Sequence, residues 1–495
     1  MPYIVIKKIA NIVHRMKALN HIIITCVLLI LLIAAGCKKD IITTNSDAKL
    51  NFSVDSILFD TVFTSIGSTT KTFKLYNNNK QKVNISKAYL VGGAGSQFRI
   101  NIDGVSGPEV SNIEVLSGDS LFVFVQVTVN PTGSNNPVLI NESLVFETNN
   151  NSQQIALTAV GQDVHLHVPD IFPTNGTPAY SKINTSTAWT NDKPHLIFGY
   201  AVVDSDSILT MNPGTKVYMN TGAVLWVFKN GSLVINGNKD NEVTFEGARL
   251  EEKYDDVAGQ WGKIWLFAGS KNNVINWANI KNGGIGVQVD SLGNPGQPTL
   301  TISNTIINNM SAAAIFAKEG HIKAYNNVFS NCGQYLVALS SGGNYNFEHC
   351  TFYNGWTSST RATPSLYLNN YFITGTTYYA RDLDSAYFGN CIIDGNLEEE
   401  ISLDQVTNQG IFSFKFENCL LKTKYDVASD TTYFKNNLKN VSPGFVDADG
   451  YNYRLSNVSP AIDKGKSSLY TKDLNNEVRP NPSTSIADVG AYEFY

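Results

Sequence analysis

An eight-residue pattern recurs between Leu300 and Leu421, and it constrains the fold more than any other feature of the chain. Apolar residues or small alanines occupy its first, third and eighth positions. The copies are LTISNTII from Leu300, IKAYNNVF from Ile322, YNFEHCTF from Tyr345, AYFGNCII from Ala386 and FKFENCLL from Phe414. They begin 22, 23, 41 and 28 residues apart. A shorter copy, LYLNNYF from Leu366, lies in the longest gap, so we expect two coils there.

A period of roughly 20 to 25 residues indicates one structural unit per repeat. Each copy alternates apolar and polar residues as a strand does, and Gly, Asn, Ser and Lys lie between the copies. No stretch of this region has a long helical period, which excludes a doubly wound α/β fold. We therefore expect a solenoid of parallel strands in which equal positions stack about 4.8 Å apart.

The fifth position of the pattern carries a polar side chain in every copy. An amide at a bend can hydrogen-bond to the same position one coil above and below, which satisfies a buried polar group. We predict a structural ladder of Asn304, Asn326, His349, Asn390 and Asn418. The sixth position holds Cys350, Cys391 and Cys419. We interpret these cysteines as small inward hydrophobes, with a Cys391–Cys419 disulfide as the alternative.

These repeats resemble those of right-handed parallel β-helix proteins of the pectate-lyase-like superfamily. The right hand is implied by this resemblance, since the pattern alone does not determine it. The resulting fold class is all-β: an N-terminal immunoglobulin-like β-sandwich, then a right-handed parallel β-helix solenoid with a C-terminal cap.

The first 36 residues have the pattern of a secretion signal. Four basic residues and no acidic one precede Cys37, and residues 21–36 form an apolar run too short for a membrane span of about 20 residues. The sequence Ala34-Ala35-Gly36-Cys37 resembles a bacterial lipoprotein signal, which implies cleavage before Cys37 and lipidation of its thiol. The charged residues after Cys37 resemble those of Bacteroidetes surface lipoproteins. We therefore expect an outer-membrane lipoprotein on a Gram-negative cell surface, held through lipid on Cys37, with Met1 or Met16 as its start.

The whole chain has a net charge of −5, and loss of the basic N-terminal residues makes the remainder more acidic. This charge argues against nucleic acid as a partner.

The chain divides into several expected regions. Residues 1–36 are the signal and 37–48 a tether. Residues 49–164 show strand-and-turn spacing typical of a sandwich and resemble an immunoglobulin-like domain of the abnormal-spindle and Hydin type. Proline-rich residues 165–199 are expected to form a linker, and 200–441 the solenoid.

The last region, 442–495, contains the motif Ser-Pro-Ala-Ile-Asp and a terminal Asp-x-Gly-Ala-Tyr-Glu. It resembles the segment that ends many bacterial surface β-helix proteins. We expect it to cap the open end of the solenoid, because exposed strand edges invite aggregation. We also expect Arg479 to form a structural ion pair with Asp488 or Asp463.

Residues suited to catalysis are sparse. A uronate lyase of the resembling fold needs carboxylates that bind Ca²⁺ and a Lys or Arg base. The candidates are Arg361, Arg381, Asp382 and Asp384, which lie on separate loops. No zinc spacing, nucleophile elbow or phosphate loop is present, and no metal or other cofactor is expected unless the protein is a Ca²⁺-dependent lyase.

Binding requires fewer residues than catalysis. Protruding loops carry aromatic and cationic candidates for stacking on sugar rings and meeting acidic groups. These candidates are Trp356, Arg361, Tyr378 and Tyr379. The favoured hypothesis is a non-catalytic surface adhesin or glycan-binding module. The alternative is a polysaccharide lyase or glycoside hydrolase acting on an acidic polysaccharide, and a third possibility is a structural spacer.

Overall fold

The computed structural model describes residues 12–27, 41–183, 186–291 and 296–495. Cys37 and part of the expected signal lie outside the described residues. Residues 12–27 are helical. In the part of the chain that is described, no helix has the length and apolar character needed to cross a membrane. The chain divides into two compact units, Met1–Asn130 with Leu139–Gly161, and Pro131–Val138 with Gln162–Tyr495.

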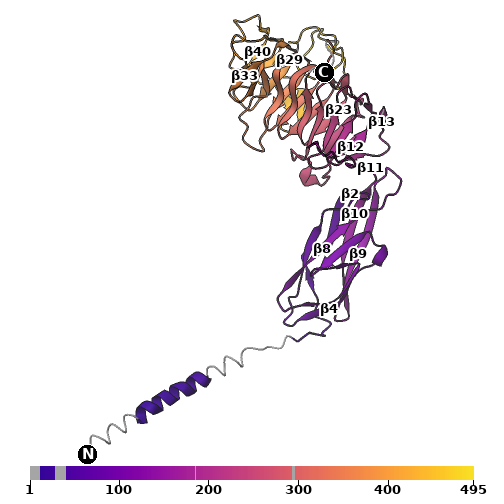
Figure 1. Cartoon of the computed structure of the whole chain (residues 1–495), viewed down its shortest axis with the longest axis vertical. Coiled ribbons are helices and arrows are strands. Elements are labelled where there is room, and N and C mark those ends of the chain that lie inside the picture. The colour runs from indigo at the N-terminus through magenta and orange to yellow at the C-terminus, as the bar shows by residue number, and fades with distance from the viewer. Residues whose placement is uncertain (1–11, 28–40, 184–185, 292–295) are drawn as a thin grey trace, which may run out of the picture. The chain divides into compact units, whose positions relative to one another are not determined.

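The first unit is an antiparallel β-sandwich, which confirms the predicted fold class (Figure 1). Its two sheets have the strand orders β1–β3–β8–β5–β6 and β2–β10–β9–β4–β7. The strands are β1 (Asn51–Phe52), β2 (Ser56–Phe63), β3 (Lys71–Tyr76), β4 (Val83–Leu90), β5 (Phe98–Ile102), β6 (Val105–Gly107), β7 (Glu109–Val115), β8 (Ser120–Val127), β9 (Val138–Thr148) and β10 (Asn151–Gln162). Alternate residues of β8, such as Val123 and Val125, are buried between the sheets.

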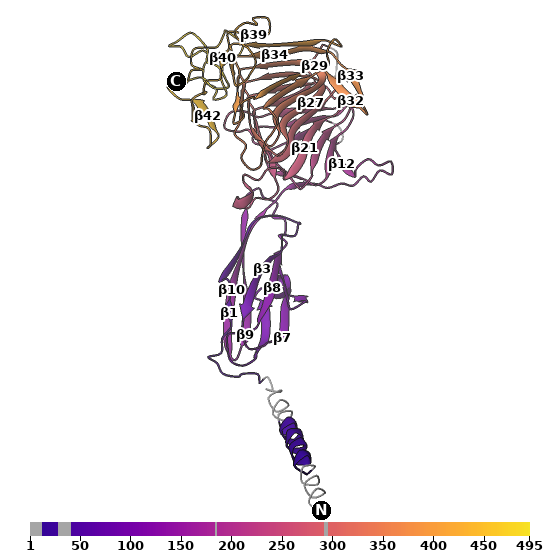
Figure 2. The same ribbon diagram turned by 90° about the vertical axis from the view of Figure 1, so that its left-hand side faces the viewer.

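The second unit is a solenoid of parallel strands (Figure 2). Most coils add two strands to a 17-stranded sheet and one to an 11-stranded sheet, and in some coils the first two strands are merged into one long strand. The 17-stranded sheet contains β12 (Tyr180–Ile183), β13 (Thr187–Trp189), β15 (Tyr200–Val203), β16 (Ile208–Met211), β18 (Val224–Val227), β19 (Ser232–Asn236), β21 (Trp261–Leu266), β22 (Asn273–Asn276), β24 (Gly283–Asp290), β25 (Leu300–Ser303), β27 (Ala313–Tyr325), β29 (Tyr335–Glu348), β31 (Leu366–Asn369), β34 (Leu383–Gly389), β36 (Ile401–Asp404), β37 (Phe412–Glu417) and β39 (Phe434–Lys435).

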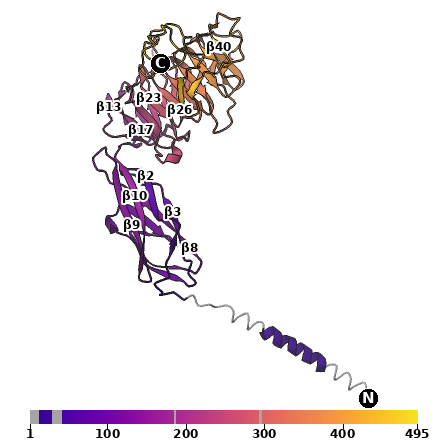
Figure 3. The same ribbon diagram turned by 180° about the vertical axis from the view of Figure 1, so that it is seen from behind.

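The 11-stranded sheet faces the viewer more directly in Figure 3, where β17, β23, β26 and β40 are labelled. Its strands are β11 (His165–His167), β14 (His195–Ile197), β17 (Lys216–Met219), β20 (Val243–Gly247), β23 (Ala278–Lys281), β26 (Ile306–Met310), β28 (Val328–Cys332), β30 (Thr351–Asn354), β35 (Ile392–Gly395), β38 (Leu420–Leu421) and β40 (Leu438–Lys439). Two antiparallel pairs stand apart from these sheets, β32 (Tyr371–Thr374) with β33 (Thr377–Ala380), and β41 (Phe445–Asp447) with β42 (Asn452–Leu455).

Two details of the repeat differ from the expectation. Residues 165–199 are not a linker, because β11, β12, β13 and β14 already belong to the two solenoid sheets. The 41-residue gap holds one coil and not two, since Phe352 of β30 pairs directly with Ile393 of β35. The copy LYLNNYF forms β31 and then enters the inserted hairpin β32–β33, so it is the first arm of the same coil.

The fifth-position residues share one backbone conformation. Asn304, Asn326, His349, Asn390 and Asn418 all have φ between 49° and 54°, the left-handed region that asparagine tolerates well. Asn326 Nδ2 donates to Asn304 Oδ1 at 3.2 Å, and Asn304 Nδ2 donates to Asn276 Oδ1 at 2.9 Å. Asn390 Nδ2 lies 2.9 Å from His349 Nε2. Asn418 instead donates to the Lys464 carbonyl at 2.9 Å.

The sixth-position cysteines are free and fully buried, and no disulfide joins Cys391 and Cys419. The Cys391 amide donates to Cys419 Sγ at 3.4 Å. Burial raises the pKa of the Cys391 thiol well above its usual value, so the group stays protonated. The cysteines therefore fill the core as small hydrophobes.

The C-terminal segment, residues 442–495, lies against the outer face of the 11-stranded sheet, whereas it was expected over the open end of the solenoid. The seventh residue of each repeat points outward and is covered by this segment. Val328 packs with Tyr453, Leu474 and Ala491. Ile392 and Leu420 pack with Leu455, Ala461 and Val489. This contact explains why each repeat ends in two adjacent residues suited to burial: one faces the solenoid core and the other faces the C-terminal segment.

The solenoid core at the last coil is covered by residues between β38 and β39. Tyr425 and Val427 pack against it. Within the C-terminal segment, Arg479 pairs with Glu493 at 3.1 Å and not with Asp488 or Asp463 as predicted. The Arg479 guanidinium also donates to Asn326 Oδ1 at 2.7 Å, so the pair joins the segment to the ladder.

Candidate functional site

The loop after β30 was expected to expose Trp356 and Arg361, but the structure buries both. Trp356 is 6% exposed, and its indole Nε1 donates to Ser359 Oγ at 2.9 Å. A buried indole offers no face to a sugar ring, so this expectation is corrected. Sequence reasoning treated a polar, proline-containing loop as protruding, whereas it folds back over the coil.

Arg361 is held in a closed ion pair. Its Nη1 and Nη2 donate to the two carboxylate oxygens of Glu400 at 2.8 and 2.6 Å, and the two side chains are 1% and 0% exposed. Glu400 also accepts hydrogen bonds from Ser365 and from the Leu397 amide. A guanidinium bound in this way cannot take a proton from a substrate or meet a solvent-exposed acid, so Arg361 is a structural residue.

Arg381, Asp382 and Asp384 follow the hairpin β32–β33 and do not form an acid–base site. Arg381 pairs with Glu319 and lies 4.8 Å over the ring of Phe372. Asp382 Oδ1 accepts the Ile411 amide hydrogen at 2.8 Å, which ties two loops together. Asp384 is exposed. In the described part of the chain, no three His, Cys, Asp or Glu residues converge to hold a metal ion, so these aspartates do not form the Ca²⁺ site that a lyase would need.

The two candidate tyrosines of the hairpin point to opposite faces. Tyr378 is 52% exposed and lies 5.2 Å from the ring of Tyr371. Tyr379 is 43% exposed and stacks on Phe372 at 5.1 Å. Alternation along a strand separates neighbouring side chains in this way. Only Tyr378 therefore faces the groups described next.

A carboxylate and tyrosines meet on the outer face of the 17-stranded sheet. Tyr367 and Tyr371 both donate their hydroxyls to Asp404 Oδ2, at 3.0 and 2.6 Å. Tyr335 lies 5.5 Å from Tyr367, ring to ring. We call Tyr335, Tyr367, Tyr371, Tyr378 and Asp404 the tyrosine face.

The tyrosine hydroxyls remain protonated donors. Burial and the bond to Asp404 raise the pKa of Tyr367, and the bond to Asp404 followed by burial raises that of Tyr371. Asp404 forms no ion pair with any residue that the structure describes. Its carboxylate lies beside partly exposed aromatic rings.

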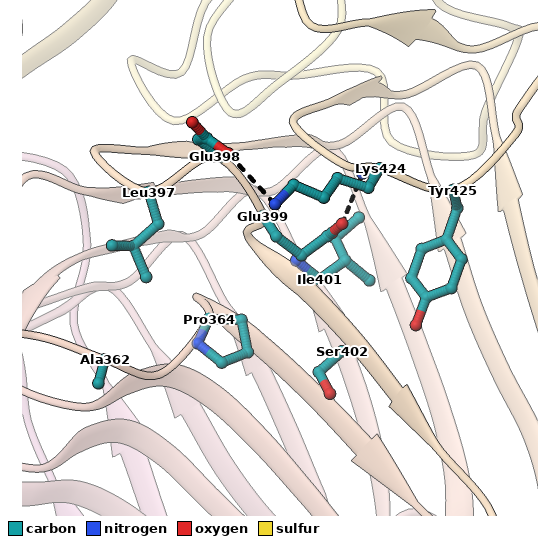
Figure 4. Close-up of a pocket in the computed structure, with 9 residues that line it drawn as sticks. All are labelled: Ala362, Pro364, Leu397, Glu398, Glu399, Ile401, Ser402, Lys424 and Tyr425. Atoms are coloured by element: carbon teal, nitrogen blue, oxygen red, sulfur yellow. Dashed lines mark hydrogen bonds and ion pairs between the residues drawn. The ribbon is translucent and has the colours of Figure 1, made fainter.

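A cavity of about 570 Å³ adjoins this face (Figure 4). Ala362, Pro364, Leu397, Glu398, Glu399, Ile401, Ser402, Lys424 and Tyr425 line it, and we call it the loop cavity. Ser402 and Asp404 lie two residues apart on β36, and Ser402 pairs in register with Tyr367. The loop cavity and the tyrosine face are therefore continuous along one strand.

The Arg361–Glu400 pair holds in place the turn that forms one wall of the loop cavity. Leu397, Glu398 and Glu399 belong to the turn that Glu400 closes through the Leu397 amide. Asn396 Nδ2 donates to the Trp356 carbonyl at 2.9 Å, and Arg361 Nη2 contacts the Asn396 side chain. Two residues predicted to bind ligand thus hold the wall of a cavity that they do not line.

Carboxylates outnumber cations at this site. The loop cavity contains Glu398, Glu399 and one lysine, Lys424, which pairs with Glu398 at 3.2 Å, and the tyrosine face adds Asp404. The arrangement offers oxygen acceptors, tyrosine rings and a concave wall. It provides no exposed arginine for an acidic group.

Comparison with known proteins agrees with this architecture. The family model of the right-handed β-helix region matches residues 199–352 and again 296–457. The chain belongs to the right-handed β-helix family. No curated protein matches this β-helix protein.

Three solved structures share low similarity with this β-helix protein. The complex of XylC with xylose is 10% identical with a TM-score of 0.39, over 89% of this chain and 88% of that one. The catalytic unit of a GH87 α-1,3-glucanase from Streptomyces thermodiastaticus is 8% identical with a TM-score of 0.17, over 74% and 89%. A family 123 glycoside hydrolase from Clostridium perfringens is 7% identical with a TM-score of 0.17, and the match spans 23% of this chain and 26% of that one.

Sequence reasoning missed Tyr367 and Asp404, although the pattern contained a usable signal. Tyr367 is the second residue of the copy LYLNNYF, an outward position in an alternating strand. Asp404 lies 37 residues later. Only the correct coil register places both residues on the same face of the β-helix.

Proposed function

We propose that this β-helix protein binds a glycan at the tyrosine face and the adjoining loop cavity. The observation that carries the proposal is the convergence of Tyr367 and Tyr371 on one oxygen of Asp404. A carboxylate held by tyrosine hydroxyls beside exposed rings offers both an acceptor for sugar hydroxyls and an apolar surface for the sugar ring.

The charge of the site favours a neutral glycan. Glu398, Glu399 and Asp404 would repel the carboxylates of an acidic polysaccharide, and Lys424 is already paired with Glu398. Neutral sugar rings meet no such repulsion. We therefore propose a neutral ligand in place of the acidic polysaccharide considered from the sequence.

The geometry favours binding over catalysis. A lyase requires a free base beside bound substrate, and Arg361 is enclosed by Glu400 whereas Arg381 pairs with Glu319. The proposed function is therefore that of a glycan-binding surface protein or adhesin.

We also propose that lipid on Cys37 anchors the protein to the outer membrane. The motif Ala34-Ala35-Gly36-Cys37 supports this proposal. Mass spectrometry of the mature N-terminal peptide should show acyl chains on Cys37. Cys37→Ser should release the protein from the membrane fraction, and an unmodified N-terminus in the wild type would contradict the proposal.

The glycan proposal is tested by co-sedimentation of the purified protein with insoluble neutral and acidic polysaccharides. Absorbance of newly formed carbon–carbon double bonds and release of reducing sugar are followed in the same samples. We expect binding to a neutral polysaccharide, loss of binding in Asp404→Ala, and no cleavage. Cleavage would replace the proposal with an enzymatic one, and failure to bind any glycan would overturn it.

A further inference from the structure

His349 is the one member of the fifth-position ladder that is not asparagine. It is fully buried and has the same backbone conformation as its neighbours, with φ at 50°. Asparagine adopts the same left-handed backbone conformation at Asn304, Asn326, Asn390 and Asn418. The ladder alone therefore gives no reason for an imidazole at this coil.

The hydrogen bonds around His349 determine its tautomer. The Lys466 amide donates to Asn390 Oδ1 at 2.8 Å, which fixes the orientation of that side-chain amide. Asn390 Nδ2 then donates to the Lys466 carbonyl at 3.0 Å and to His349 Nε2 at 2.9 Å. Because Nε2 accepts, the proton of the neutral ring lies on Nδ1.

His349 Nδ1 therefore carries a buried N–H donor. No protein group among the described residues accepts from it in good hydrogen-bonding geometry. The backbone carbonyls of Gly490 and Asp488 lie close enough to act as weak acceptors and to raise the pKa of the ring, but they leave the donor poorly satisfied. A buried donor without a well-placed acceptor is unfavourable, so its presence calls for a partner.

The imidazole lines a cavity of about 330 Å³ between the ladder and the C-terminal segment. Lys466 and Arg479 also line it, with the exposed hydroxyl residues Ser467, Thr471 and Ser485 at its opening. All of these side chains can donate hydrogen bonds. The volume exceeds the space of a single water molecule, about 30 Å³.

Two cations lie close enough to act on the imidazole. Burial, then Arg479 and Lys466, lower the pKa of His349 well below its usual value. Arg479 and Lys466 are anchored by Glu493 and Glu417, at 3.1 and 2.6 Å. The cations are thus held in place beside a neutral imidazole, which suits an anion that accepts several hydrogen bonds.

We propose that this cavity binds a tetrahedral oxyanion, a phosphate or sulfate group, with His349 Nδ1–H as the buried donor and Lys466, Arg479 and the rim hydroxyls completing its shell. The site is separate from the glycan site of the proposed function. Bound anion would hold residues 465–487 against the coils.

The chain itself supplies the matched variant for a test. His349→Asn places the usual ladder residue at this bend, so we expect the fold to be retained while the buried N–H donor is removed. Lys466→Met removes a cation from the cavity but leaves the backbone bonds of Lys466 to Asn390 intact, and it serves if His349→Asn does not fold.

The experiment is calorimetric titration of the purified protein and both variants with inorganic phosphate, inorganic sulfate and a sugar monosulfate, against acetate and chloride at equal ionic strength. We expect the wild type to bind at least one tetrahedral oxyanion and to melt at higher temperature in its presence. His349→Asn and Lys466→Met should bind it at least tenfold more weakly. Selective binding of the sugar monosulfate would identify the ligand as an ester group rather than the free ion.

Two outcomes would overturn the proposal. One is a wild type that binds no tetrahedral oxyanion more tightly than acetate or chloride, which would mean that water fills the cavity. The other is a folded His349→Asn protein with wild-type affinity, which would show that the imidazole takes no part.

Discussion

Arg361 and Glu400 lie 39 positions apart and form a two-point ion pair with almost no solvent exposure. The pair closes the loop after β30 against the turn before β36. Every acceptor that Arg361 uses is also buried or part-buried, which makes the pair a fixed part of the coil rather than a ligand-binding group.

Removal of one partner should destabilise the protein strongly. In Arg361→Met the Glu400 carboxylate remains buried without its cation, and we expect a loss of about 3–5 kcal/mol in the free energy of unfolding. Denaturant titration followed by near-ultraviolet circular dichroism measures this loss.

A double variant provides the control. Arg361→Met with Glu400→Leu removes both charges and should recover much of the lost stability, because no unpaired charge remains. Lys424→Met, which breaks an exposed pair, should leave the unfolding midpoint unchanged. A single variant as stable as the wild type would contradict the assignment of Arg361 to a structural role.

The ladder predicts that alanine substitutions at Asn326 and Asn418 reduce the stability of the protein by different amounts. Asn326 makes three side-chain contacts, with Asn304, the Lys472 carbonyl and Arg479. Asn418 donates to a single carbonyl, that of Lys464. Alanine adds the same backbone strain at both sites, because both residues have φ of 54°.

Asn326→Ala should therefore cost more than Asn418→Ala, by about 1–3 kcal/mol, since it leaves one buried N–H of the Arg479 guanidinium and the Lys472 carbonyl without this partner. Thermal unfolding of both variants measures the difference. Equal losses would show that the bend conformation alone, and not the hydrogen bonds, stabilises the ladder.

Glu417 should make stability depend on acid pH. Burial tends to raise the pKa of its carboxyl, but hydrogen bonds from Lys466, Lys435 and Tyr387 outweigh burial and lower that pKa to about 2. The unfolded chain has the ordinary value near 4.5. The stabilisation that the Glu417 carboxylate gives to the folded state is therefore complete above pH 4.5 and is lost as the pH falls toward 2.

The test compares melting temperatures of the wild type and Glu417→Gln between pH 2 and pH 7. Above pH 4.5 we expect the wild type to melt at a higher temperature than Glu417→Gln. This difference should shrink steadily as the pH falls and vanish near pH 2. A constant difference across this range would mean that the lysine contacts do not depend on the charge of Glu417.

The repeat predicted the solenoid because stacking in a coil imposes the same demands on equal positions. Inward residues such as Phe347, Phe388 and Phe416 stack ring on ring at 5.3 and 4.8 Å, and this regularity is visible in the sequence. The first coils were missed because residues 165–199 contain four prolines and no copy of the eight-residue pattern, although their short strands pair in the same sheets.

The candidate site was predicted less well, because it depends on contacts between distant segments. Asn396 and Glu400, from the next coil, hold the loop of Trp356 and Arg361 through the Trp356 carbonyl and the Arg361 guanidinium. The two adjacent residues suited to burial that end each repeat were visible in the sequence, but the reason for the outward one lies in the C-terminal segment. Local composition does not encode such long-range packing.

The most direct test of the account compares Tyr378→Ala with Tyr379→Ala in binding to the neutral polysaccharide that the wild type retains. Both residues are exposed neighbours on β33, but only Tyr378 lies beside Tyr371 on the tyrosine face. We predict that Tyr378→Ala weakens binding about tenfold, ~1.4 kcal/mol, whereas Tyr379→Ala binds like the wild type. Equal effects of the two substitutions, or no effect of Tyr378→Ala, would contradict a glycan site on the tyrosine face.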